Sequence, residues 1–398
     1  MNVLVLGAGA YQVSGIKKLK EKGFFVVALD GNPASPGKEF ANEFKQCNIL
    51  SFEEVKDYIL EKGEDFFDAC LSFCTDAPMK VLGEINDFFG FMGISKKLAQ
   101  ISVDKFLQRE KMVAAGLPTP AFQLLNSPDD LLNIEFPCVV KPVDSAGSRG
   151  VSVVWSKKEY DKAIINAFDT SKSGKCIVEE FIVGTEYTAE VLLHNGQQEI
   201  LGISEKFKPL QNYTVSNQLH YNSPRAKRHY NQIASILKRF FETAHYDNSI
   251  THTELILNEK NNQFYLIESS LRSGGFAIFD EVLPYLSDDD IVGKTIDVYL
   301  GKEVELDIKK EKSVIMNFVS SNPGKLISYS MDGNVYSNFE GASEKHGFFL
   351  KEGDEVKALD SDGARVAFIL TFADNWHKAF ELSNLVEYSM NIDVERLE

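Results

Sequence analysis

The alternation of hydrophobic and polar residues in the first part of the chain predicts strands and helices in turn. Residues 2–6 and 24–29 are short apolar runs that are typical of buried strands, and apolar positions around Ile16 recur with helical spacing. A further strand is predicted over residues 65–73. Because a strand–helix–strand order is typical of a parallel sheet covered by helices, we predict a Rossmann-like α/β domain over residues 1–95.

The pattern in the middle of the chain predicts further helices together with strands that follow one another closely. Ser102 is predicted to cap a helix with an apolar face, which carries Val103, Phe106, Leu107, Val113 and Ala114. Further helices are predicted to begin at Ser127, after Ser156 and before Ile233. The predicted strands of this region cover residues 136–141, 151–155, 176–180, 251–257 and 264–267.

From about residue 303 the pattern changes to short β-like runs separated by turns rich in Gly, Asp and Ser. The predicted strands cover residues 314–319, 325–329, 335–339, 356–359 and 365–372. A closing helix is predicted over residues 376–388. We therefore predict a small β-rich C-terminal domain over residues 303–398.

The composition is that of a globular protein with an acidic balance. The 398 residues are 44% hydrophobic, which suffices for a sizeable core and for two or three domains. The formal net charge of −16 argues against unassisted binding to nucleic acid or to an anionic membrane. The start of the chain is strand-like, so neither a signal peptide nor a membrane span is expected. The cysteines follow no zinc spacing and are expected to be reduced, which favours the cytoplasm: Cys47, Cys70, Cys74, Cys138 and Cys176.

The first chemical signal lies where two neighbouring strands carry acidic residues. Glu254 lies on the first strand, and the second strand ends in Glu268, Ser270 and Arg272, followed by two glycines. The polar residues 258–262 predict a turn that folds the two strands into a hairpin. Both carboxylates can then face one site, and a carboxylate pair beside a guanidinium is suited to a metal ion next to an anion.

A second signal is the loop that follows Lys141. Ser145, Gly147 and Ser148 are small residues whose backbone amides can approach a phosphate closely, and Lys141 and Arg149 add positive charge. The loop is not a Walker loop, because no Gly-Lys-Ser/Thr opens a helix. The alternative is a plain glycine turn between two strands. Lys105, in the first turn of its predicted helix, is another candidate cation, with a solvated surface lysine as its alternative.

A third signal is an acidic strand end followed by an apolar connector. Glu179 and Glu180 end one strand, Phe181 and Ile182 follow, and a new strand begins at Glu186. Taken alone, such acids are more often solvated than functional.

Near the N-terminus the order strand, Gly7, Gly9, helix, strand and Asp30 imitates a dinucleotide fold, which suggests NAD as one ligand. The third glycine of that fingerprint is missing, because Gln12 stands in its place, so a structural turn is the favoured interpretation. Cys74, Thr75 and Asp76 follow the predicted strand 65–73, at the end of the sheet where ligands of open α/β folds tend to bind.

The order and spacing of these signals resemble the ATP-grasp superfamily. The resemblance rests on Asp104-Lys105, on the strand ending in Lys141-Pro142, and on three acidic motifs that follow them. Those motifs are Glu179-Glu180-Phe181-Ile182 with Glu186, the strand with Glu254, and Glu268-x-Ser270-x-Arg272. The resemblance implies an α/β and α+β chain, in which an ATP-grasp domain over residues 96–302 has a mobile lid at about 120–185. It is greatest to the carboxylate–amine ligases, which include amino-acid and dipeptide ligases, carbamoyl-phosphate-synthase-like and biotin-carboxylase-like enzymes.

For the nucleotide, the resemblance implies one role for each motif. Lys105 and Lys141 would hold the phosphates. The loop with Ser145, Gly147 and Ser148 would close over them. The Glu179 side chain, together with the backbone of Phe181 and Ile182, would recognise adenine, and Glu186 would bind the ribose hydroxyls.

For the metal and the substrate, the resemblance implies that Glu254 and Glu268 coordinate Mg²⁺, or Mn²⁺ as an alternative. The family pattern Glu-x-Asn departs here, because Ser270 stands in the place of the Asn. A serine hydroxyl is a shorter and weaker ligand, so a weaker second metal or a loss of activity stays open. Arg272 would grip the substrate carboxylate or the transferring phosphoryl group. His220 is a candidate neighbour of the acceptor substrate, whereas His252 is expected to support packing beside Glu254.

The resemblance implies a cytoplasmic, ATP-dependent, ADP-forming ligase that activates a carboxylate as an acyl phosphate and couples it to an amine. The alternatives are a purine-biosynthesis or carbamoyl-phosphate-type ligase, a non-catalytic ATP-binding module, and an NAD-dependent dehydrogenase. The expected partners are small-molecule carboxylate and amine substrates, with neither nucleic acid nor membrane. The sequence leaves the assembly state open and allows a homodimer.

Overall fold

The computed structural model describes residues 1–209, 215–306, 308, 311–337, 339–359 and 361–396. The N-terminal part is an α/β unit whose parallel sheet has the order β3-β2-β1-β4. Its elements are β1 (Asn2–Leu6), η1 (Ala10–Gln12), α1 (Val13–Glu21), β2 (Phe25–Asp30), η2 (Pro36–Glu39), β3 (Glu43–Gln46), α2 (Phe52–Lys62), β4 (Ala69–Leu71), α3 (Met79–Phe89) and α4 (Lys96–Val103). Strand β1 is buried because helices cover the sheet, as the apolar run predicts.

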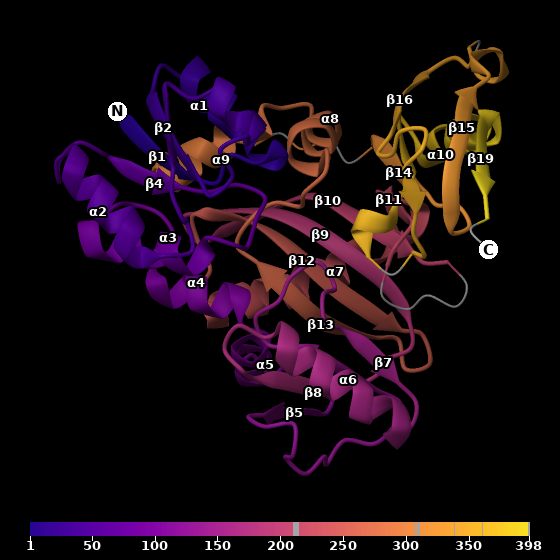
Figure 1. Cartoon of the computed structure of the whole chain (residues 1–398), viewed down its shortest axis with the longest axis horizontal. Coiled ribbons are helices and arrows are strands. Elements are labelled where there is room, and N and C mark those ends of the chain that lie inside the picture. Colours follow the sequence, from indigo (N-terminus) through magenta and orange to yellow (C-terminus); the bar gives the residue numbers. More distant parts are fainter. Residues whose placement is uncertain (210–214, 307, 309–310, 338, 360, 397–398) are drawn as a thin grey trace.

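The next part is a small four-stranded sheet of order β5-β8-β6-β7, which lies with α5 and α6 at the bottom of Figure 1. The elements are α5 (Lys105–Ala114), β5 (Phe122–Leu125), β6 (Cys138–Pro142), β7 (Ser152–Val154), α6 (Lys157–Thr170) and β8 (Cys176–Glu180). The sheet and α6 enclose a hydrophobic core of their own, which contains Val140, Ile164 and Val178. A separate core is what a lid needs in order to move as one body.

A long antiparallel sheet of order β13-β12-β9-β10-β11-β14-β18-β16 joins the middle of the chain to its C-terminal part. The middle elements are β9 (Thr185–His194), β10 (Gln197–Phe207), β11 (Gln218–Tyr221), α7 (Pro224–Ala244), β12 (Ser249–Asn258), β13 (Gln263–Ser270), η3 (Ile278–Val282), α8 (Leu283–Ser287) and α9 (Ile291–Tyr299). Because β11 pairs with β14, this sheet continues across the boundary predicted at residue 302. The domain boundaries themselves stay a prediction.

The C-terminal part adds a second sheet of order β17-β15-β19 and a helix that packs on β14 and β18. Its elements are β14 (Ser313–Val319), β15 (Gly324–Met331), η4 (Gly333–Val335), β16 (Ala342–Phe348), β17 (Glu355–Val356), η5 (Asp362–Ala364), β18 (Ala367–Ala373), α10 (Trp376–Ser389) and β19 (Met390–Glu395). The β-rich character and the closing helix are confirmed. Among the described residues, no helix is both long and apolar enough to cross a membrane.

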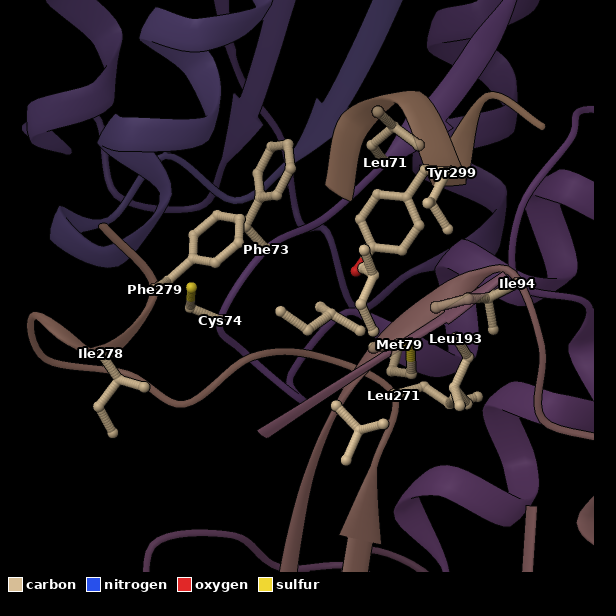
Figure 2. Close-up of a cluster of buried hydrophobic side chains, with 14 of the residues drawn as sticks. Leu71, Phe73, Cys74, Met79, Ile94, Leu193, Leu271, Ile278, Phe279 and Tyr299 are labelled. Carbon is tan, nitrogen blue, oxygen red and sulfur yellow. The ribbon is translucent and has the colours of Figure 1, made fainter. Parts of the chain in front are cut away.

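A cluster of buried side chains holds the N-terminal unit against the end of β13. Figure 2 shows Phe73, which follows β4, beside Phe279, and Leu271 below Met79. The rings of Phe73 and Phe279 stack with their centroids 5.9 Å apart, and Tyr299 lies 6.3 Å from Phe73. Asp76 lies three residues after Phe73, and Arg272 directly follows Leu271. The apolar contact therefore brings these two charged residues together from distant parts of the chain.

Three predicted elements are wrong in detail. The cap of α5 is Asp104, whose Oδ1 accepts hydrogen bonds from the backbone amides of Phe106 and Leu107, whereas Ser102 belongs to α4. The apolar residues expected on its buried face do not form that face, since Val113 is 53% exposed. The buried side chains of α5 are instead Lys105, Gln108, Arg109 and Met112.

The short helix predicted from Ser127 is a turn, because the Asp130 carboxylate accepts the backbone amides of Asn126 and Ser127 at 2.7 and 3.0 Å. Such local side-chain bonds compete with a helix. The strand predicted over residues 335–339 is likewise wrong, since residues 333–335 form a short 3-10 helix and residue 338 lies outside the described residues.

Candidate active site

A cavity of about 690 Å³ lies between the small sheet, the long sheet and the N-terminal unit. This volume is in the range of small-molecule binding sites. Every residue assigned to the site from the sequence lines it: Lys105, Lys141, Ser145, Gly147, Ser148, Glu179, Phe181, Ile182, Glu186, Glu254, Glu268, Ser270 and Arg272. The structure thus brings all of them together, although their individual roles stay predictions.

The predicted hairpin of β12 and β13 is confirmed, and it places two carboxylates opposite each other. Glu254 pairs with Glu268 in the antiparallel register, and a β-bulge follows directly, so that Leu255 pairs with Leu266. Bulges of this kind re-aim side chains beside functional sites. Both glutamates and Ser270 therefore face the cavity from adjacent strands.

A lysine neutralises each of these glutamates. Glu254 forms an ion pair with Lys206 of β10, and Glu268 Oε1 lies 3.3 Å from Lys105 Nζ. Burial by itself raises the pKa of Glu254, but the charges of Lys206 and His252 lower the pKa well below its usual value. The Glu254 carboxylate is consequently ionised at neutral pH and able to bind a cation.

These donors fit a Mg²⁺ ion that shares its coordination with a ligand. Mg²⁺ prefers oxygen donors and is commonly held by one or two carboxylates together with water and phosphate oxygens. In the described parts of the chain, no group of three or more His, Cys, Asp or Glu side chains converges as a metal site. By their chemistry, the two glutamates are suited to a metal that shares its coordination with phosphate oxygens.

Arg272 is held by an acid from the N-terminal unit. Its Nε and Nη2 both donate to Asp76 Oδ2, at 3.0 and 2.6 Å, and Nη1 donates to the Ser273 carbonyl at 3.0 Å. Burial raises the pKa of Asp76, but the Arg272 charge outweighs it, and the pKa ends below its ordinary value. Asp76 thus fixes the guanidinium at the cavity edge.

Glu179 lies at the centre of a buried charge cluster. Its carboxylate accepts from Arg109 Nε at 2.5 Å and Nη2 at 3.2 Å, and Lys141 Nζ lies 2.6 Å from Oε2. Burial raises the pKa of Glu179, but Arg109 and Lys141 lower it to about 2. The predicted adenine contact would therefore use a carboxylate that already has two cationic partners.

Sequence reasoning missed Arg109, which is fully buried on α5 and also donates to the Leu266 carbonyl at 2.8 Å. The available signal was its spacing, since Arg109 lies four residues after Lys105 and so shares a helix face with it. Lys206 and Lys208 were missed as well. They are two residues apart at the end of β10, and Lys208 pairs with Glu186.

The loop after Lys141 adopts the conformations that its small residues permit. Gly147, Ser148 and Gly150 have φ of 66°, 58° and 73°, in the left-handed region. Lys105 Nζ donates to the Ser145 carbonyl at 2.6 Å, which ties the loop to α5. Arg149 is exposed and its Nε donates to the Ala146 carbonyl at 3.1 Å, so this guanidinium is directed to the loop itself.

The two histidines differ in their surroundings. His220 is 2% exposed among aromatic rings, with the Phe207 centroid 4.3 Å away, and burial lowers the pKa of His220 to about 4. These contacts make it a neutral packing residue in the described structure. His252 lines the cavity and contacts the buried Glu190. Burial lowers the pKa of His252, but Glu190 raises it more, to about 9.

The glycine turn near the N-terminus is filled by a side chain. Gln12 Nε2 donates to the Phe73 carbonyl at 2.5 Å, and Gln12 Oε1 accepts from the Phe73 amide at 2.8 Å. The same Nε2 lies 3.2 Å from the position that a Cβ would take at Gly7. Asp30 accepts the Ala8 amide at 2.7 Å. The Gln12 side chain therefore fills the space beside the glycine turn where a dinucleotide would bind. The Asp30 carboxylate, which would bind the ribose, is already hydrogen-bonded to the backbone.

We accordingly expect NAD to leave the melting temperature unchanged and ATP with Mg²⁺ to raise it. A ligand that binds only the folded protein stabilises it by an amount that grows with the logarithm of its concentration over Kd, and a hundredfold excess over Kd adds about 2.7 kcal/mol. Thermal shift measurements with each nucleotide at equal concentration check this. A rise with NAD alone would support the dehydrogenase alternative.

Comparison with known proteins agrees with this geometry. Residues 134–280 match the family described as "ATP-grasp domain". A formate-dependent phosphoribosylglycinamide formyltransferase of Bacillus subtilis is 28% identical over 189 residues, 45% of this chain and 48% of that protein. A D-alanine–D-alanine ligase of Aquifex aeolicus is 28% identical over 179 residues, 44% of this chain and 54% of that protein. The chain spans about half the length of these curated relatives.

The fold is also that of a solved L-amino acid ligase from Bacillus licheniformis. The two structures superpose with a TM-score of 0.84 at 17% identity, and the match covers 99% of each chain. Residues 134–280 therefore match the ATP-grasp domain, and the chain as a whole has the fold of this solved ligase. The predicted resemblance and the predicted α/β and α+β fold class are both confirmed.

Proposed function

We propose that this protein is an ATP-dependent ligase that activates a carboxylate as an acyl phosphate and couples it to an amine, with release of ADP and phosphate. The observation that carries this proposal is the shared cavity. Glu254 and Glu268 face each other there, between the lysines that can hold phosphates and the Arg272 guanidinium. The names of the two relatives, a formyltransferase and a ligase, agree with an activated carboxyl group.

In this proposal the nucleotide lies between the small sheet and the long sheet. Lys105 and Lys141 bind its phosphates, and the loop with Ser145, Gly147 and Ser148 covers them. The Ile182 backbone and the Glu179 cluster recognise adenine, with Phe181 beside them. Lys208 releases Glu186 to the ribose hydroxyls when the nucleotide binds.

Glu254 and Glu268 hold Mg²⁺ or Mn²⁺, with Ser270 as a weaker third donor. The bound metal supplies charge neutralisation at the phosphate oxygens. In its absence Lys206 and Lys105 neutralise the same glutamates, so the site stays balanced before the nucleotide arrives. With a metal bound, Glu254 and Glu268 would be the residues that hold it, and Lys105 and Lys206 would supply positive charge for the phosphates.

The chemistry requires two anions to approach each other. A substrate carboxylate oxygen attacks the γ-phosphorus of ATP, the bond to ADP breaks, and an acyl phosphate forms. Arg272, fixed by Asp76, orients the carboxylate and offsets its charge. The amine nitrogen then attacks the acyl carbon, phosphate leaves with the bonding electrons, and the surplus proton passes to solvent.

The test is ADP release from ATP and Mg²⁺ over a matrix of paired carboxylates and amines. We expect at least one pair to raise ADP formation well above background and to yield an equimolar amide product. If ATP binds but no pair ever raises ADP formation, the enzyme proposal is wrong. The alternative is then a non-catalytic ATP-binding module, which agrees with Ser270 in the place of the family's Asn. ADP release with a purine-pathway amine or bicarbonate would favour the other ligase types.

The same proposal includes the cytoplasm as the compartment. All five cysteines are buried and free, which suits a reducing environment. Small-molecule substrates are proposed as the partners, and a homodimer is proposed as the assembly, to be checked by light scattering at several protein concentrations.

A further inference from the structure

We propose that one of the two coupled substrates is an amino acid with an aromatic or bulky aliphatic side chain. This proposal rests on the proposed ligase function and names the substrate class of the same site. It is carried by an aromatic wall, defined here as Phe276, Phe318 and Phe349, which lines one side of the cavity.

The rings of the aromatic wall contact one another at the distances of edge-to-face pairs. The Phe276 centroid lies 5.4 Å from both Phe318 and Phe349, and Phe368 packs behind them, 4.8 Å from Phe276. These mutual contacts fix the orientation of the rings. The wall is therefore a formed surface that needs no rearrangement to accept an apolar group.

The wall is assembled from parts of the chain that are distant in sequence. Phe276 follows β13, Phe318 lies on β14, and Phe349 follows β16. Tyr11 of the N-terminal unit also lines the cavity, and its ring lies 3.5 Å from the position that a Cβ would take at Gly275. Because all four aromatics meet beside one cavity, a ligand there would be enclosed by the three parts of the molecule together.

Two of these rings are incompletely buried in the described structure. Phe349 is 43% exposed and Tyr11 is 51% exposed, and both border the cavity. Leaving apolar area of this size in contact with water is unfavourable, and a cluster of such side chains beside a pocket is typical of a ligand contact. An apolar side chain of the substrate would cover this area.

The place of the aromatic wall relative to Arg272 assigns it to the substrate and not to adenine. Phe276 lies four residues after Arg272, beyond the glutamates that are proposed to hold the metal. The proposed adenine contacts, Phe181 and Ile182, come from the connector after β8, where Trp155 lies 5.8 Å from the Phe181 ring. The aromatic residues that line the cavity thus come from separate parts of the chain, with Phe181 in the connector after β8 and the aromatic wall in the segments after β13 and from β14 onward.

The charges beside the wall suit an amino acid. The Arg365 guanidinium lies 3.6 Å from the Phe318 ring centroid and lines the cavity, so a cation is held at the wall by stacking. The buried Glu190 accepts the amide of Gly274, two residues before Phe276, at 3.1 Å and contacts His252, which lines the cavity. A carboxylate can face Arg365 while the side chain lies on the rings.

The test compares Phe349→Ala with Tyr388→Ala, a matched control that removes an aromatic ring, 83% exposed, from the same C-terminal part. In an ADP-release assay we expect L-phenylalanine, L-leucine or L-methionine to be used with higher kcat/KM than glycine, L-aspartate or L-lysine. Phe349→Ala should lower kcat/KM for the apolar amino acid about ten- to a hundredfold, mostly through KM, with an unchanged KM for ATP. Phe349→Leu should retain most of the wild-type kcat/KM for the apolar amino acid.

Binding supplies a readout that does not depend on turnover. We expect L-phenylalanine to raise the melting temperature of the wild type and of Tyr388→Ala above the value reached with ATP and Mg²⁺ alone, and to cause no such additional rise in Phe349→Ala. ADP release that is confined to polar substrates, or an unchanged Phe349→Ala variant, would overturn the proposed substrate class while leaving the ligase function intact. ADP release with no substrate pair, together with L-phenylalanine binding at the wall, would overturn the ligase function alone.

Discussion

Replacing Glu268 with glutamine is expected to abolish ADP release, with kcat reduced by about a thousandfold or more, while ATP binding stays within an order of magnitude. The reason is that Glu268 is one of only two carboxylates that the β12–β13 hairpin places opposite each other in the cavity. Interactions of this kind count most where charge develops in the transition state. Glutamine keeps the shape of the side chain and removes its charge.

Two measurements separate this metal role from a structural one. Titration with Mn²⁺, followed by its paramagnetic resonance signal in the presence of ATP, should show weaker metal binding in Glu268→Gln. The matched control is Glu281→Gln, which removes a glutamate that pairs with Lys345 at 2.7 Å on the surface. The control should turn over like the wild type. Wild-type turnover in Glu268→Gln itself would refute the metal assignment.

The hairpin was predictable because strands alternate their side chains with a period of two. Glu254 precedes one apolar run and Glu268 follows the next, and the polar turn between the runs fixes which residues can pair. The same local logic found the strand that ends in Lys141. Where a site is built from polar residues at the ends of apolar strands, the sequence shows which residues those are, and they can be assigned to one site.

The pairing of Arg109 with Glu179 and that of Asp76 with Arg272 were not predictable, because each joins positions that are far apart along the chain. Arg109 pairs with a residue 70 positions away, and Arg272 pairs with one 196 positions away. On α5, helix periodicity suggested an apolar face with Val113, but two of the four buried side chains, Lys105 and Arg109, are charged. Their burial is favourable only because Glu179 and Glu268 lie opposite, which the local pattern does not contain.

The C-terminal strands show a related limit. Strand β16 was missed because its residues, Ala342 to Phe348, are mixed in polarity and pair along only one edge, with β18. Strand β19 was missed because its residues follow α10 directly and alternate between half-buried and exposed positions at the edge of a small sheet. Edge strands carry a weak apolar signal, so turn positions predict them better than hydrophobicity does.

Replacing Arg109 with methionine is expected to destabilise the protein by about 3 kcal/mol, with a clear drop in melting temperature. Arg109 is fully buried and donates two hydrogen bonds to Glu179. Removing one partner of a buried ion pair costs about 3–5 kcal/mol, and the low end applies because Lys141 still contacts Glu179. The control Arg239→Met removes an exposed arginine that donates to the Ala115 and Gly116 carbonyls, and it should change stability by less than about 1 kcal/mol.

The pH dependence of this loss identifies Glu179 as its cause. The pKa of Glu179 is about 2 in the folded protein against 4.5 ordinarily, so its stabilisation is complete above pH 4.5 and is lost as the pH falls toward 2. Without Arg109 the pKa of Glu179 in the folded protein rises, so the ionised Glu179 contributes less stabilisation that can be lost at low pH. The difference in melting temperature between wild type and Arg109→Met should therefore be constant from pH 8 to about pH 5 and should narrow below that. A difference that stays constant down to pH 3 would show that the loss comes from packing alone and not from the charge of Glu179.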